Sequence, residues 1–227
     1  MSLTEAGIIA YERSIEVFIK YAPMIDERLN KYKRILIRRG NVKTYFKPLT
    51  IKSVDITFHL IPNCLGKTDF NKYGLRVLVA GEFRLNGDRY YSLLLNGTSK
   101  EFSQIAIYTT HFLERYVERH LGDDSPINIE TFIKFLKETD AISCGFQEGN
   151  SDNIQWTTSI GNICGCVLHP RVLLSKTYID NSTIIRGKKK EANEKGNELT
   201  KYFTTNKIGF RTIPKSMSKN YNFTLKK

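Results

Sequence analysis

Three residues of one predicted helix have the types and the spacing for chemistry at a phosphodiester. His111, Arg115 and Arg119 recur every four residues, so an α-helix brings them to one side. An imidazole in this place is a candidate general base, and two guanidinium groups are candidates for holding a phosphate and stabilising its charge. The alternative is an ordinary solvated helix face.

The charges along this helix are poorly arranged for its own stability. Glu114 and Glu118 are like charges four residues apart. Arg115 and Arg119 repeat that arrangement, and each such pair is mildly unfavourable. Only Arg115 and Glu118 make a favourable local pair. The arrangement therefore favours partners elsewhere in the fold or in a ligand.

The apolar pattern predicts the elements that position these side chains. A strand over Ser103–Tyr108 leads into a helix over Thr110–Leu121, for which Thr109 is the expected N-cap. A second helix over Asn128–Glu138, with Asn128 as its expected N-cap, follows a Gly- and Pro-containing turn. An antiparallel meander of three strands is then predicted over Ile154–Thr158, Asn162–Leu168 and Val172–Ile179.

The first hundred residues predict helices followed by a β-rich region. Residues 4–20 have a helical pattern that ends or restarts at Pro23, and a basic helix over Met24–Arg39 is closed by Gly40. The segment Pro62–Tyr73 is expected to be an irregular loop. Strands are predicted over Val54–Ile61, Leu75–Leu85 and Tyr90–Leu95, the last two joined by an Asn-Gly hairpin turn.

Composition and charge indicate a polyanionic partner. The 227 residues are 41% apolar, enough for a packed core, and carry 35 Lys and Arg against 23 Asp and Glu, for a net charge of +12. No apolar run approaches the roughly 20 residues that span a bilayer. The start of the chain lacks the basic and apolar pattern of a signal peptide, so we expect a cytoplasmic protein with no membrane partner.

Two basic segments are candidates for nucleic-acid contacts. The predicted helix over Met24–Arg39 offers Arg34, Arg38 and Arg39, and an ordinary solvated helix whose long side chains cover apolar surface explains its sequence equally well. Residues 186–227, a predicted basic helix and tail, hold 12 of the chain's bases and only 3 acids, which gives +9. Aromatic residues lie between these bases, a composition suited to stacking on unpaired nucleotides. The candidate contacts of this segment are Lys188, Lys189, Lys190, Lys201 and Arg211.

No metal or other cofactor is expected. Cys164 and Cys166 share a strand face while His169 points to the other, and the usual pair of Cys-x-x-Cys knuckles is missing. A metal-hydrolase alternative would use His111, Glu114 and Glu118, but Arg115 among them disfavours a dication.

The run Ile107–Arg119, followed by a second helix and a strand meander ending at Ile179, resembles the compact ribonuclease-toxin fold of the RelE/ParE superfamily. The resemblance covers residues 103–180, roughly a third of the chain. Members cleave ribosome-associated mRNA or inhibit DNA gyrase, so the fold alone does not choose the activity.

This resemblance implies roles for the residues of the helix. His111 would take the 2′-hydroxyl proton, Arg115 and Arg119 would clamp the phosphate, and Tyr116 or Trp156 would stack on a base. A protein antitoxin or the ribosome would be the macromolecular partner.

The sequence thus predicts an α+β protein: a helical segment over 1–46, a core over 47–185 with a RelE-like portion at 103–180, and a basic helix and tail over 186–227. The predicted function is metal-independent cleavage of RNA phosphodiesters. The alternative is a non-catalytic RNA- or DNA-binding protein of a mobile element or of an uncharacterised bacterial family. RNA is the favoured nucleic acid.

Overall fold

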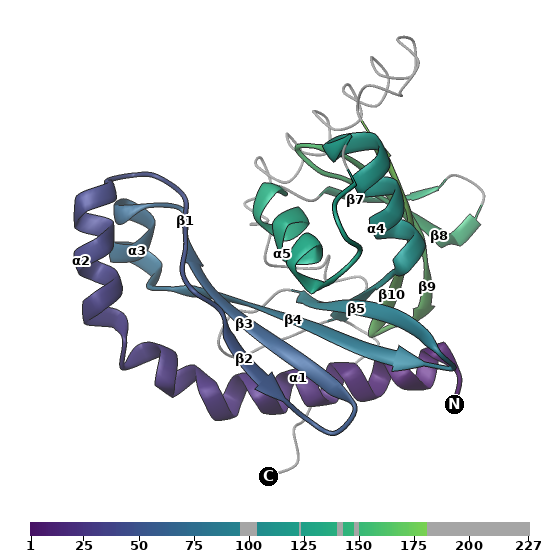
Figure 1. The fold of residues 1–227 in the computed structure, drawn as a ribbon, viewed down its shortest axis with the longest axis horizontal. Helices are drawn as coiled ribbons and strands as arrows, with labels where there is room; N and C mark the ends of the chain where they lie inside the picture. Colours follow the sequence, from purple (N-terminus) through teal and green to yellow (C-terminus); the bar gives the residue numbers. More distant parts are fainter. Residues whose placement is uncertain (96–103, 123, 140–142, 148–149, 181–227) are drawn as a thin grey trace. The chain divides into compact units, whose positions relative to one another are not determined.

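A computed structural model describes residues 1–95, 104–122, 124–139, 143–147 and 150–180. Residues Met1–Ile184 form one compact unit. Within it, helices pack against a mixed, mostly antiparallel sheet, which confirms the α+β class (Figure 1). The expected basic helix and tail over 186–227 lies outside the described residues.

The sheet has two antiparallel halves that meet at one parallel pair. Its strand order is β1-β3-β4-β5-β6-β10-β9-β8-β7, and β2 also pairs with β3. Only β6 and β10 run parallel, with Ile105 opposite Val172. The strands are β1 (Thr44–Tyr45), β2 (Leu49–Lys52), β3 (Ile56–Cys64), β4 (Arg76–Leu85), β5 (Asp88–Leu95), β6 (Gln104–Thr109), β7 (Ser143–Gln147), β8 (Asn150–Thr157), β9 (Gly161–His169) and β10 (Val172–Asp180).

Alternating side chains of the central strands build two separate cores. In β6, Ile105 and Ile107 face one core while Ala106 and Tyr108 face the other, as the two-residue period of a strand requires. Helix α1 (Leu3–Asp26) covers the first face. It approaches closely at Gly7, where a Cβ atom would lie 2.5 Å from a Val172 methyl carbon.

The opposite face is covered by α4 (Thr110–Tyr116), a π-helical turn η1 (Val117–Leu121) and α5 (Ile129–Glu138). The predicted caps are confirmed, because Thr109 accepts a hydrogen bond from the amide of Phe112 and Asn128 caps α5. The helix predicted to end at Leu121 does end there, but its last turn is π-helical. The core beneath these helices is rich in aromatic rings.

Other local predictions are confirmed or corrected. The Asn-Gly turn between β4 and β5 is confirmed, with positive φ at both residues, 52° and 91°. The segment Pro62–Tyr73 was expected to be an irregular loop, and this was wrong. β3 continues to Cys64 and helix α3 (Lys67–Tyr73) follows. Gly66, at φ 143°, supplies the sharp turn between them, and its placement against Asn41 leaves no room for a side chain.

The remaining differences concern helix ends and strand pairing. Helix α1 continues past Pro23 and ends at Asp26, and α2 (Leu29–Arg39) begins after a short break. The predicted meander has a fourth strand, β7, and its last strand joins β6 in parallel. In the part of the chain that the structure describes, no helix is long and apolar enough to cross a membrane.

Candidate nucleic-acid interface

The amphipathic sequence of α2 buries one face and exposes a row of cations on the other. Tyr32 and Leu36, one turn apart, are buried in the core beside α1. The ring centroids of Tyr32 and Phe46 are 4.2 Å apart. Gly40 ends the helix at φ 66°, a conformation that favours glycine. The buried pair thereby fixes which side chains of α2 face solvent.

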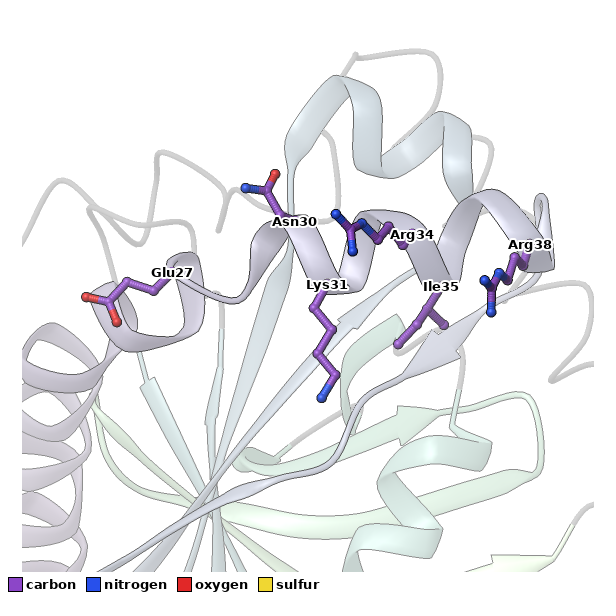
Figure 2. Close-up of a pocket in the computed structure, with 6 residues that line it drawn as sticks. All are labelled: Glu27, Asn30, Lys31, Arg34, Ile35 and Arg38. Carbon is purple, nitrogen blue, oxygen red and sulfur yellow. The ribbon is translucent and has the colours of Figure 1, made fainter.

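A shallow groove of about 580 Å³ runs along the exposed side of α2 (Figure 2). A second hollow adjoins it toward the segment after β1, and the two share Lys31 and Ile35. Lys31 and Ile35 project from the same side of the helix in Figure 2. We call the two together the α2 groove, lined by Glu27, Arg28, Asn30, Lys31, Tyr32, Arg34, Ile35, Arg38, Phe46 and Lys47.

The cations of the α2 groove have no anionic partner among the described residues. Arg28, Lys31, Arg34, Arg38 and Lys47 make no ion pair there, and Glu27 is the one acid among the lining residues. Like charges three and four residues apart on a helix each cost about 0.2–0.5 kcal/mol. The groove therefore gathers positive charge that no described side chain neutralises through an ion pair.

The N-terminus of α2 adds to this imbalance. Arg28 occupies the N-cap position and makes no capping hydrogen bond, and the first turn contains no acidic residue. A cation at that end opposes the helix dipole, whereas Asp, Ser or Asn would stabilise it. Helix α2 thus begins with a positive charge at a position where a capping or acidic residue would stabilise it more.

The predicted catalytic residues of α4 and η1 lie on one continuous helix but contact different partners. His111 is 54% exposed, and its Nδ1 lies 3.4 Å from a carboxylate oxygen of Glu114. Arg115 forms a 2.5 Å ion pair with Glu118, the pair that the sequence predicted to be favourable. Each of these side chains therefore already has a partner on its own helix.

Arg119 points in a different direction, because it belongs to the π-helical turn. Its guanidinium donates a 2.8 Å hydrogen bond to the main-chain carbonyl of Tyr178 on β10. A π turn is wider than an α turn and shifts the side chains that follow it. Arg119 thus ties η1 to the sheet, while His111 points to solvent at the other end of the helix.

The structure reveals a polar cluster around His120 that the sequence patterns did not identify. Its Nδ1 lies 3.2 Å from Asp180 on β10, and its Nε2 lies 3.5 Å from Glu138 at the end of α5. The ring also stacks on Tyr116, whose hydroxyl donates a short hydrogen bond to Glu138. We call these residues with Tyr178 the His120 cluster.

The His120 cluster joins η1, α5 and β10, and its charged side chains are partly buried. The Tyr178 hydroxyl donates a 2.7 Å hydrogen bond to the carbonyl of Ile160. Burial raises the pKa of Tyr178, and the nearby carboxylates of Asp180 and Glu138 act in the same direction. A protonated imidazole donates from both nitrogens, so His120 can bind both carboxylates at once. The residues come from three separated segments of the chain, so only their long-range pairing could have shown the cluster.

The other predicted residues have less defined roles. Arg39 is exposed in the last turn of α2, and Trp156 lies in β8. Cys164 and Cys166 lie on β9, and burial raises the pKa of Cys164. His169 Nδ1 accepts a hydrogen bond from the amide of Arg171. Within the described ranges no group of His, Cys, Asp and Glu side chains is arranged to hold a metal ion.

Several predicted contacts fall outside the described residues. They are the five bases of the expected tail, Lys188, Lys189, Lys190, Lys201 and Arg211.

Comparisons of the chain with models of protein families, with curated protein sequences and with solved structures found no match. Its function therefore has to be inferred from the chemistry of its own residues.

Proposed function

We propose that the protein binds nucleic acid through the α2 groove. The observation that carries this proposal is the set of cations around one groove, Arg28, Lys31, Arg34, Arg38 and Lys47, without an ion pair among the described residues. Phosphates of a nucleic acid would satisfy these groups and release bound counterions. The net charge of +12 would assist the approach of such a polyanion.

A binding function fits this geometry better than phosphodiester cleavage by the predicted triad. Cleavage needs a base and a phosphate clamp that converge on one reacting group. His111 and Arg115 contact carboxylates of α4 and η1, and Arg119 contacts the backbone of β10. Ribonuclease activity of the RelE type, with its antitoxin or ribosome partner, stays a prediction, which a cleavage assay with His111→Ala tests.

Charge reversal in the groove tests the binding proposal. In Arg34→Glu/Arg38→Glu, we expect the Kd for nucleic acid to rise at least about tenfold, because two cations of the groove are replaced by acids that repel a polyanion. The slope of log Kd against log salt should also become smaller, because the variant attracts the polyanion less strongly. Fluorescence anisotropy at several salt concentrations measures both quantities.

A matched control separates the groove from net charge. Arg13→Glu/Lys20→Glu changes the charge by the same amount at exposed positions of α1, away from the groove. This variant should change the Kd by less than about threefold. Equal losses in both variants would show that binding is a matter of net charge, and an unchanged Kd in the α2 variant would rule out the groove. Circular dichroism checks that both variants are folded.

A further inference from the structure

We infer that α2 is a recognition helix for the major groove of duplex DNA. This inference rests on the proposed function and specifies its ligand. The outer side of α2 carries a row of exposed side chains, of which Ile37 does not line the groove.

The outermost side chains of α2 form a row that is suited to base edges. At about 100° per residue, Arg34 lies opposite the buried pair Tyr32 and Leu36. Asn30 and Arg38 lie one turn before and after Arg34, and all three are exposed. Arginine can donate two hydrogen bonds to guanine and asparagine can pair with adenine in the major groove. The row therefore has the chemistry of direct readout.

An exposed aliphatic residue lies beside this row. Ile37 is 55% exposed and lies about 60° from Arg34 around the helix. The methyl group of thymine, which lines the major groove, is an apolar partner for it. Ile37 thus supports base contacts in addition to phosphate contacts.

The cations on either side of the row lie where phosphates of the two strands would pass. Lys31 lies about 60° from Arg34 on the side opposite Ile37, and Arg28 and Lys47 follow on that side. Lys33 is exposed on the Ile37 side. A helix in the major groove has one DNA backbone along each flank, so cations on both flanks match this placement.

The dimensions of α2 fit duplex DNA better than duplex RNA. Its 11 residues give a length of about 16 Å, and a helix with side chains is about 10–12 Å wide. The major groove of B-DNA is about 12 Å wide, whereas that of A-form RNA is too deep and narrow for a helix.

Single strands lack a stacking surface in this groove. Proteins that bind single strands expose aromatic rings on which bases stack. The aromatic rings of the α2 groove, Tyr32 and Phe46, are each only 7% exposed and contact one another. A single strand would therefore gain phosphate contacts here and little more.

The first experiment compares ligands of the same sequence and length. The probes are a duplex DNA selected from a randomised pool for tight binding, its separated strand, and the corresponding duplex RNA. We expect the duplex DNA to bind at least about tenfold more tightly than either of the others at equal salt. Equal or tighter binding of the single strand or the RNA would overturn the inference while leaving the proposed function intact. Binding of none of the three would overturn both.

Base analogues then identify the groove that is read. Replacing guanine by 7-deazaguanine removes the N7 acceptor from the major groove, and replacing it by inosine removes the amino group from the minor groove. We expect the first change to weaken binding by about fivefold or more and the second to leave the Kd within about twofold. The reverse result would overturn the placement in the major groove.

Substitutions in the row supply the protein side of the test. Asn30→Ala and Ile37→Ala should each reduce the preference for the selected duplex over an unrelated duplex by about fivefold, with little change for the unrelated one. Lys31→Ala, the matched change at a flank, should weaken both duplexes equally. Equal losses for all three variants would show that α2 contacts only the backbone and would overturn the recognition role.

Discussion

The outer face of α2 and the charged face of α4 and η1 carry similar residues and differ in what those residues contact. On α2, the groove cations Arg34 and Arg38 make no ion pair among the described residues. On α4 and η1, His111 and Arg115 contact carboxylates, and Arg119 contacts a backbone carbonyl. The spacing of the charged residues along each helix therefore does not distinguish the two faces. The contacts that these residues make in the fold do distinguish them.

The same difference extends to the role of each region in the fold. Buried residues of α4 belong to the aromatic core between the helices and the sheet, and η1 is joined to β10 and α5 through the His120 cluster. Among the side chains of α2 whose burial is described, Tyr32 and Leu36 are buried and Ile35 is partly buried against the same core. We therefore expect changes in α4 and η1 to act on stability and changes on the outer face of α2 to act on binding.

The largest expected effect comes from the core beneath α4. Phe112 is fully buried and contacts Tyr108, Phe135 and Tyr178, so Phe112→Ala should lower the free energy of unfolding by about 3–5 kcal/mol. Arg34→Ala, at an exposed site, should change it by less than about 0.5 kcal/mol. Urea unfolding followed by circular dichroism measures both. Similar losses in the two variants would contradict the division between the regions.

A second prediction concerns the His120 cluster. Asp180 is only 9% exposed, so Asp180→Ala should cost about 1–3 kcal/mol by leaving partners in the cluster unsatisfied. His120→Ala should couple with it, so that the double variant loses less than the sum of the two single losses. Denaturant unfolding of the four proteins gives the coupling energy.

The division between the regions would break if this cluster acted on a ligand. A Kd for nucleic acid that rose in Asp180→Ala while stability stayed constant would assign the His120 cluster to the binding site. If the wild type cleaves RNA and Asp180→Ala loses that activity while stability stays constant, the His120 cluster would be assigned to catalysis.

The sequence predicted the elements whose signals are local. The Thr109 and Asn128 caps, the Asn-Gly turn and the amphipathic helices all follow from side chains within a few residues of one another. The basic character of α2 also followed, so Arg34 and Arg38 were correctly expected on an exposed helix face.

The sequence could not predict features that depend on distant pairing. The parallel contact of β6 with β10 joins residues separated by two helices and three strands. It brings Asp180 to His120 and the carbonyl of Tyr178 to Arg119. Helix α3 was missed because its short, polar sequence between two glycines has the composition of a loop.

A third prediction concerns pH and a histidine outside both regions. Burial lowers the pKa of His59, and Glu82 and Glu130 oppose this shift. Its Nδ1 lies 3.2 Å from the Thr50 hydroxyl. Above about pH 6.5, the value for an unfolded chain, His59 is neutral in both states. As the pH falls below that value the unfolded chain binds a proton that the folded chain resists, so stability declines.

The test measures the free energy of unfolding between about pH 5 and 8. His59→Gln removes this titration and should flatten the decline below about pH 6.5. An unchanged profile in His59→Gln would show that other groups cause the acid sensitivity.

The smallest expected effect is the most direct test of the difference between the two helix faces. Arg115 and Glu118 form an exposed pair, with 36% and 60% of their side chains accessible, so Arg115→Glu should cost less than about 1 kcal/mol of stability. It should also change the Kd for duplex DNA by less than about twofold, whereas Arg34→Glu, with the same change of charge, should raise it about tenfold.

Either departure from that pattern would have a specific meaning. A tenfold loss of binding in Arg115→Glu would place the nucleic acid on α4 as well as on α2. If the wild type cleaved RNA in excess chelator and Arg115→Glu did not, Arg115 would act on the phosphate despite its ion pair with Glu118. That result would favour the predicted ribonuclease centre at His111, Arg115 and Arg119 over a function limited to binding. The cations of this centre would then exchange their contacts within the protein for contacts with the substrate.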